Sequence, residues 1–216
     1  MENTVYFLPN SDARQSQIYF YIPMGDYNRE ENVRREAFNQ YISGGFSGLI
    51  MNEIREKNSM AYTAYGFASS CGLPGAQTYF SGYIGTQNDK AVDAIDLYMK
   101  LLTDMPERPG RIDNIKSYLR QSALTDHPDS RNLSLRIAEW KRRGYTDDPA
   151  KKELPLIDSL TFPDIVDYYQ KNIKGKPIII GVLGNPKDIS IDALKKFGKV
   201  IRLNEKKLFN EKDTMF

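Results

Sequence analysis

Arg55 and Tyr62 are two long polar side chains that lie seven positions apart across a break in the chain. Arg55 lies near the end of a predicted helix and Tyr62 at the start of a predicted strand, so their side chains can converge on one spot. The same two residues are also compatible with a purely structural arrangement. Basic residues at a helix C-terminus stabilise the helix dipole, and a strand tyrosine can simply pack in a sheet.

The histidine and cysteine counts restrict the other chemistry that this chain can perform. Its one histidine, His127, lies in a turn sequence and is expected to face solvent, and its one cysteine, Cys71, is expected to be a buried or turn-packed thiol. A zinc site built on imidazoles needs two or three histidines, and a serine or cysteine nucleophile usually needs one beside it. We therefore expect no disulfide, no thiolate cluster and no metal site in this chain.

The charge balance and the absence of several motifs argue against further functional classes of protein. The chain has 30 basic and 28 acidic residues among 216, a balance that gives no global attraction to nucleic acid. Phosphate-binding glycine motifs and the G-x-S-x-G motif are absent. The most apolar segment, residues 177–183, is much shorter than the roughly 20 residues of a membrane span, and the first residues do not resemble a signal peptide. The 14 tyrosines favour a surface that handles peptides.

Hydrophobic periodicity and turn residues predict a mixture of strands and helices. Hairpin-like neighbours, without strict β-α-β alternation, indicate an α+β fold: an antiparallel sheet backed by helices. We expect a single domain over residues 1–216, with a possible internal break near 106–110. The predicted strands are 17–23, 61–70, 76–84, 178–183 and 199–203, and the predicted helices are 30–41, 46–57, 89–102, 111–124, 131–143, 161–172 and 191–197.

The predicted helix 46–57 and strand 61–70 carry the two polar residues. An apolar stripe of Phe46, Leu49, Ile50 and Ile54 is expected to fill the core, which places Arg55 on the opposite face of the helix. Alternation along the strand puts Tyr62, Ala64, Gly66 and Ala68 on one face. Apart from Tyr62 that face is small, which suits a close approach of another element.

Residues 44–62, GGFSGLIMNEIREKNSMAY, resemble a motif of the insulinase/pitrilysin family of zinc metallopeptidases, in the second domain of each half. The resemblance is strong over residues 17–80 and weaker but consistent to residue 203. It implies the α+β repeating unit of insulinase- and mitochondrial processing peptidase-type proteins. The shared features are the double glycine, a serine two positions later, the Arg-Glu-Lys triplet and a tyrosine seven residues after the arginine.

The resemblance also implies a function. In this family one half binds zinc through H-x-x-E-H. The zinc-free half closes over it and places an arginine and a tyrosine in contact with the substrate. These correspond to Arg55 and Tyr62, which would hydrogen-bond the peptide backbone and stabilise the oxyanion of the tetrahedral intermediate. Ala64 and Gly66 would lie near the extended peptide. Zinc would reside in a companion N-terminal half, in the same polypeptide or in a separate subunit.

This sequence departs from the family pattern at three points. Ser59 stands where a glycine is common, which is expected to alter the helix-to-strand turn, and Gly48-Leu49-Ile50 stands where Ser-Arg-Leu is common. With one histidine, H-x-x-E-H cannot exist, so we expect the isolated chain to be inactive.

Two alternatives to the role of a substrate-binding peptidase domain remain. The chain could be a catalytically degenerate scaffold or assembly subunit of the same family, or an unrelated α+β binding module. An H-x-x-E-H motif encoded upstream or in a neighbouring reading frame would favour the peptidase.

Overall fold

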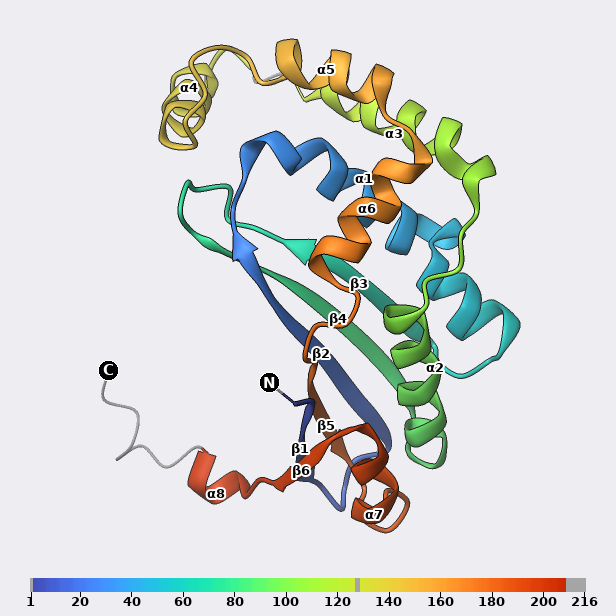
Figure 1. The fold of residues 1–216 in the computed structure, drawn as a ribbon. Coiled ribbons are helices and arrows are strands. Elements are labelled where there is room, and N and C mark those ends of the chain that lie inside the picture. The colour runs from blue at the N-terminus through green and yellow to red at the C-terminus, as the bar shows by residue number, and fades with distance from the viewer. Residues whose placement is uncertain (1, 127–128, 209–216) are drawn as a thin grey trace.

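A six-stranded sheet forms the centre of the computed structural model, which describes residues 2–126 and 129–208. The strand order is β3-β4-β2-β5-β1-β6 (Figure 1). The pairs from β3 to β5 are antiparallel, whereas β1 runs parallel to both β5 and β6. The strands are β1 (Thr4–Pro9), β2 (Gln15–Asp26), β3 (Thr63–Ser69), β4 (Gln77–Gln87), β5 (Ile179–Gly184) and β6 (Lys199–Arg202).

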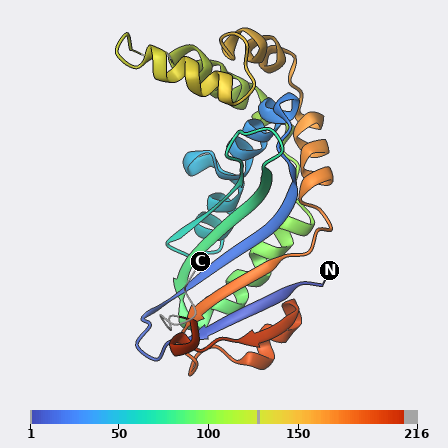
Figure 2. The same cartoon turned by 90° about the vertical axis from the view of Figure 1, so that its left-hand side faces the viewer.

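Helices α1, α2 and α6 cover one face of this sheet, and α3, α4 and α5 form a layer beyond α1 (Figures 1 and 2). The two short helices α7 and α8 flank β6 in the chain. The helices are α1 (Asn32–Ser43), α2 (Ala91–Thr103), α3 (Ile112–Thr125), α4 (Leu133–Arg142), α5 (Ala150–Ser159), α6 (Phe162–Asn172), α7 (Ile191–Leu194) and α8 (Glu205–Leu208). In the described residues no helix has the length and apolarity needed to span a bilayer.

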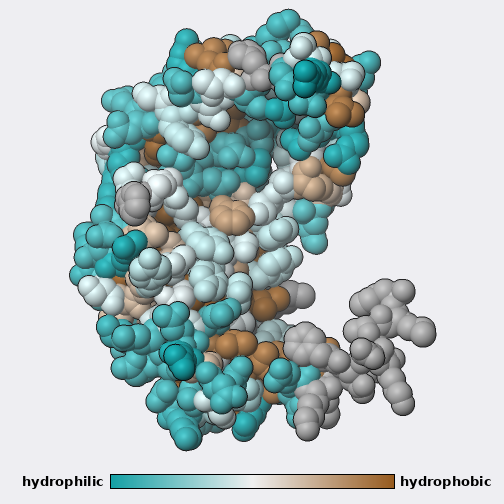
Figure 3. Space-filling view, turned by 180° about the vertical axis from the view of Figure 1, so that it is seen from behind, coloured by the Kyte–Doolittle hydropathy of each residue, from teal (hydrophilic) through white to brown (hydrophobic). Residues whose placement is uncertain are grey.

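Buried and exposed side chains alternate along β2 and β4, so that one face of the sheet forms the core and the other is open. Ile18 and Phe20 of β2 are buried under the helices, while their neighbours Tyr19 and Tyr21 are exposed on the other side. Tyr19 contacts the ring of Tyr83 on β4, with 5.1 Å between ring centroids. Figure 3 shows this open face as a broad area of intermediate hydropathy in the middle of the molecule.

Tyr98 of α2 fixes the distance between the helix layer and the sheet. Its fully buried ring stacks on Phe20 with 4.0 Å between centroids, and its hydroxyl donates a hydrogen bond to the Tyr65 carbonyl at 2.9 Å. Gly66 and Gly82 face each other in the β3–β4 register directly beneath this hydroxyl. A Cβ on either glycine would overlap Tyr98 Oη, so both positions require glycine for the close approach.

Side chains of α1 cover the outer edge of β3. Ser43 Oγ accepts a hydrogen bond from the Gly66 N–H at 2.8 Å, and Asn39 both accepts from the Ala68 N–H at 2.7 Å and donates to its carbonyl at 3.1 Å. Arg35 donates to the same carbonyl at 3.2 Å. These residues recur every four positions along one helix face. They occupy the backbone groups through which another strand could pair with this part of β3.

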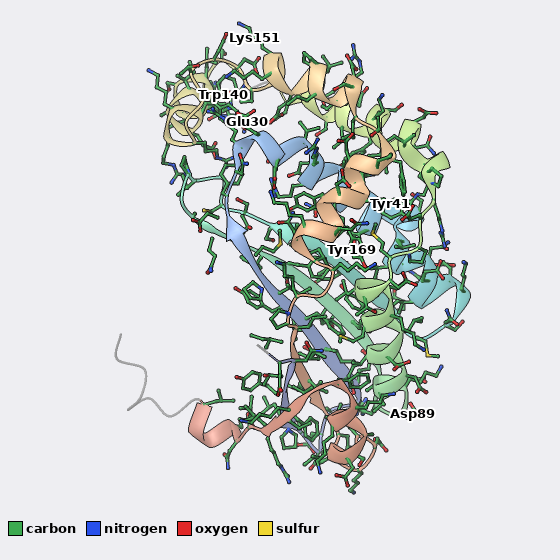
Figure 4. All side chains as sticks on the ribbon, viewed as in Figure 1. Glu30, Tyr41, Asp89, Trp140, Lys151 and Tyr169 are labelled. Atoms are coloured by element: carbon green, nitrogen blue, oxygen red, sulfur yellow. The ribbon has the colours of Figure 1, made fainter. Side chains whose placement is uncertain are left out.

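Buried tyrosines connect the helix layer to the segment after α2. Tyr169 of α6 donates a hydrogen bond from its hydroxyl to the Leu102 carbonyl at 3.1 Å and accepts one from the Met105 N–H at 3.2 Å. The Tyr41 hydroxyl donates to the Pro106 carbonyl. Both tyrosines lie between α1, α6 and α2 (Figure 4). These hydrogen bonds connect residues 102–106 to α1 and α6.

The structure confirms the α+β fold and the antiparallel β3–β4 hairpin, and it adds three elements that the sequence analysis lacked: β1, α5 and the short helix α8. Strand β1 was not predicted, and its parallel pairing makes the sheet mixed. Helix α5 was not predicted either; it contains Pro155. Helix α1 ends at Ser43 with Gly44 as its C-cap, and Gly45 follows with a φ of 58°. The helix predicted over 46–57 is a short 3₁₀ turn followed by a π-helix. The side chain of Phe46 lies outside the described part.

We predict that Gly82→Ala lowers the free energy of unfolding by about 1–3 kcal/mol, because the added methyl group overlaps Tyr98 Oη in a close-packed core. Gly110→Ala is the matched control, since a Cβ at Gly110 would have no heavy atom within 4 Å. Urea unfolding of both variants measures the difference. Equal stability of Gly82→Ala and Gly110→Ala would contradict the packing described above.

Candidate functional site

Arg55 is carried by a π-helix, Met51–Lys57, a rare conformation that occurs frequently at functional sites. Three fully buried side chains anchor this segment in the core: Leu49, Ile50 and Ile54. The Arg55 side chain is 38% exposed and points away from them. The predicted separation between a core-filling face and the face that carries Arg55 is thus present.

A second set of contacts holds this π-helix in place. Glu53 accepts hydrogen bonds from Lys57 Nζ at 2.9 Å and from Arg108, which lies in the segment before α3. Arg108 also donates to Asn52 Oδ1 at 3.2 Å. The charged residues around Arg55 therefore stabilise its helix and connect it to the rest of the fold.

Ser59 forms the turn between the π-helix and β3. Its φ of 50° is the only positive value among the described non-glycine residues. The Ser59 N–H donates to the Arg55 carbonyl at 2.9 Å, and the Met60 N–H donates to the Ile54 carbonyl at 2.9 Å. The left-handed turn that a glycine would form without strain is kept here with serine, at a cost of about 1–2 kcal/mol.

Tyr62 lies just before β3 and is held against the end of β4. Its N–H donates to the Gly85 carbonyl at 3.2 Å, and Thr86 Oγ1 donates to the Met60 carbonyl. The Tyr62 side chain is 78% exposed. The prediction that Tyr62 shares a face with Ala64 is wrong, because regular strand alternation begins only at Thr63.

The structure brings Arg55 and Tyr62 together. Cζ of the Arg55 guanidinium lies 5.4 Å from the centroid of the Tyr62 ring, within the range of a cation–π contact. Arg55 Nε also lies 3.5 Å from a carboxylate oxygen of Glu56. At an exposed site a cation–π contact contributes about 0.5–1 kcal/mol, so a ligand can displace the two side chains from each other.

Arg55 and Tyr62 line an open pocket of about 470 Å³ near the N-terminal end of α2. Asp89, labelled in Figure 4, marks that end of the helix. The walls come from five parts of the chain: the π-helix, residues 59–62, the end of β4, Gln15 at the start of β2, and Lys90 in the turn before α2. The pocket is large enough for one or two residues of a peptide.

Ala64 and Gly66 lie apart from this pocket. Ala64 is 2% exposed beneath the helices, and the N–H of Gly66 is already bonded to Ser43. Neither residue contributes to the pocket wall. Their small size serves the close packing of α2 and α1 against β3, which is a sufficient physical reason for the small face noted in the sequence.

Lys90, Gln15 and Gln87 belong to the pocket, and the sequence analysis did not identify them. They lie far from residues 44–62 in the chain and reach the pocket only through the pairing of β4 with β2 and β3. A correct strand register would have placed Gln87 near Tyr62, since Thr63 pairs with Gly85. No local sequence signal distinguishes these residues from other surface polar residues.

The chain has no recognisable metal site in its described part. No group of three or more histidine, cysteine, aspartate or glutamate side chains in residues 2–126 and 129–208 is placed to hold an ion. Cys71 was expected to be a buried or turn-packed thiol; it lies in the connection between β3 and β4 and is exposed, so only the buried alternative is wrong. His127, expected to face solvent, falls outside the described residues.

Comparison with known proteins gives the same family as the motif. The sequence model of the peptidase M16 inactive domain matches residues 2–110. An uncharacterized zinc protease of Streptomyces coelicolor is 27% identical over 162 residues, which cover 70% of this chain and 33% of that protein. The chain therefore spans about a third of the length of this relative.

Solved structures share the fold at low sequence identity. The peptidase M16 inactive domain from Pseudomonas fluorescens superposes with a TM-score of 0.71 at 15% identity, over 85% of this chain and 44% of that one. A protease from Helicobacter pylori gives 0.66 at 12% identity, over 85% and 45%. The periplasmic protease PqqL from Escherichia coli gives 0.65 at 15% identity, over 85% and 21%. The match to the family model, which extends over half of the sequence, shows that this chain belongs to the peptidase M16 family of zinc peptidases and carries its inactive domain.

Proposed function

We propose that this chain is the zinc-free, substrate-binding half of a zinc metallopeptidase, and that Arg55 and Tyr62 act on the peptide during hydrolysis. The observation that carries the proposal is the convergence of these two side chains on one pocket wall, with the guanidinium over the phenol ring. Their motif is the one through which the sequence resembles the family.

The chemistry of the two side chains suits a reacting peptide bond. A guanidinium carries five N–H donors, and a phenol carries one. When a peptide carbonyl becomes tetrahedral, its oxygen gains negative charge, and donors that are already in place stabilise that charge more than they stabilise the substrate. Arg55 would supply the positive charge and Tyr62 a hydrogen bond to the oxygen or to the neighbouring backbone.

Exposure of the pair argues that a second body covers it during the reaction. The two side chains are 38% and 78% exposed here, and water screens a charge at such a site. Donors of this kind are far more effective in a closed, water-excluded site. A companion half that closes over the pocket would provide this environment.

The zinc ion and the general base belong to the companion half in this proposal. The described residues of this chain do not fit a zinc site, so the contribution of this half is limited to binding, orientation and charge stabilisation. The companion would be an N-terminal half in the same polypeptide or a separate subunit. The isolated chain should then show no zinc-dependent peptidase activity.

We predict that Arg55→Ala in the complete enzyme lowers kcat by about 100-fold or more, because a donor aimed at the developing charge is lost. Arg120→Ala is the control: its guanidinium lies on α3, bound to Asp158 at 2.6 Å. Steady-state kinetics with a fluorogenic peptide would be measured at equal zinc content. An unchanged kcat in a folded Arg55→Ala enzyme would favour a scaffold role.

Two substitutions separate the role of the Tyr62 ring from that of its hydroxyl. Tyr62→Phe keeps the ring beneath Arg55 but removes the hydroxyl, so we expect kcat to fall by about tenfold with little change in folding. Tyr62→Ala removes both the hydroxyl and the ring and should reduce kcat further. If Tyr62→Phe retains full kcat while Tyr62→Ala does not, the ring positions Arg55 and the hydroxyl has no part in the reaction.

A further inference from the structure

The pocket beside Arg55 and Tyr62 contains a second cation that the proposed reaction does not use. Lys90 lies in the turn that leads into α2, 35 positions after Arg55 in the chain, and it is partly buried. It lines the same pocket as Arg55. Two cations from separate elements therefore border one cavity.

The acidic groups nearby leave Lys90 without a carboxylate partner. Glu56 is the only acidic side chain on the pocket wall, and it lies beside Arg55. Asp89 and Asp93 lie next to Lys90 in the chain, yet neither forms an ion pair with it. Throughout the described ranges no carboxylate oxygen lies within 4.0 Å of Lys90 Nζ, whose hydrogen bond to the Ser59 carbonyl is long, at 3.4 Å.

The remaining groups on the wall favour a polar ligand. Gln15 and Gln87 provide amides, and Tyr62 provides a hydroxyl, whereas the apolar contribution comes mainly from Met60 and Ala61. An ammonium has three N–H donors, so Lys90 can bind a carboxylate oxygen while it keeps its contact with Ser59. A hydrophobic side chain would find little apolar surface here.

We propose that this pocket recognises a carboxylate of the peptide substrate, with Lys90 as the residue that sets the preference. This inference rests on the proposed function, because it assumes that the peptide enters the pocket of Arg55 and Tyr62. The carboxylate is either an acidic side chain close to the cleaved bond or the C-terminal group of the peptide. Both present the same charge to Lys90.

The test uses the complete enzyme and matched fluorogenic peptides. One set carries glutamate or glutamine at each position on either side of the cleaved bond, and a second set ends in a free acid or an amide. We expect kcat/KM of the wild type to favour the carboxylate form at one position, or at the terminus, by about fivefold, and less at high salt. The responding set identifies the source of the carboxylate.

The variants assign this preference to Lys90. In Lys90→Gln the preference should disappear, and in Lys90→Arg it should remain. Lys100→Gln, on the solvent side of α2 and paired with Asp96 at 2.8 Å, is the matched control and should keep the preference. Fluorescence anisotropy of labelled peptides that carry the carboxylate or the amide compares their affinities directly. A variant with weak turnover is therefore still informative.

A wild type without any carboxylate preference would overturn the proposal, and so would a preference that persists in Lys90→Gln. The proposed function fails by a different result, an unchanged kcat of Arg55→Ala on the neutral glutamine peptide. The two proposals can therefore be rejected separately.

Discussion

The turn between the π-helix and β3 is the constraint on which the candidate site depends. Within five residues the chain must leave a helix, reverse through a left-handed serine and join the sheet beside β4. Backbone hydrogen bonds at Ser59, Met60 and Tyr62 fix this path at both ends. Because Arg55 precedes the turn and Tyr62 follows it, the geometry of the turn determines whether the guanidinium lies over the ring.

The layers of the fold support that turn from beneath. Tyr98 packs α2 close to the sheet, and Gly66 and Gly82 leave room for its hydroxyl. This packing fixes the position of α2 relative to β4. The polar row along α1 occupies the outer edge of β3. Another strand therefore cannot pair with this part of β3, and we propose that a peptide approaches through the pocket where Arg55, Tyr62 and Lys90 meet.

Local sequence patterns predicted the part of this arrangement that local forces determine. The double glycine, the apolar stripe ending at Ile54 and the Arg55–Tyr62 spacing are contiguous, and the structure confirms the convergence of that pair. Parallel pairing of β1 depends on residues about 175 positions away, and Lys90 reaches the pocket only through strand register. The exposure of Tyr62 was not predicted either, because the alternation of side chains along a strand does not show at which residue the strand begins.

The proposed charge stabilisation is tested most directly with a phosphinic peptide, whose tetrahedral phosphorus group mimics the intermediate, and with a substrate of the same sequence. The complete wild-type enzyme and Arg55→Ala would be compared for the inhibition constant of the phosphinate and for kcat/KM of the substrate. If Arg55 acts on the intermediate, the inhibition constant should rise and kcat/KM should fall, each by about 100-fold. An unchanged inhibition constant in Arg55→Ala would contradict the account.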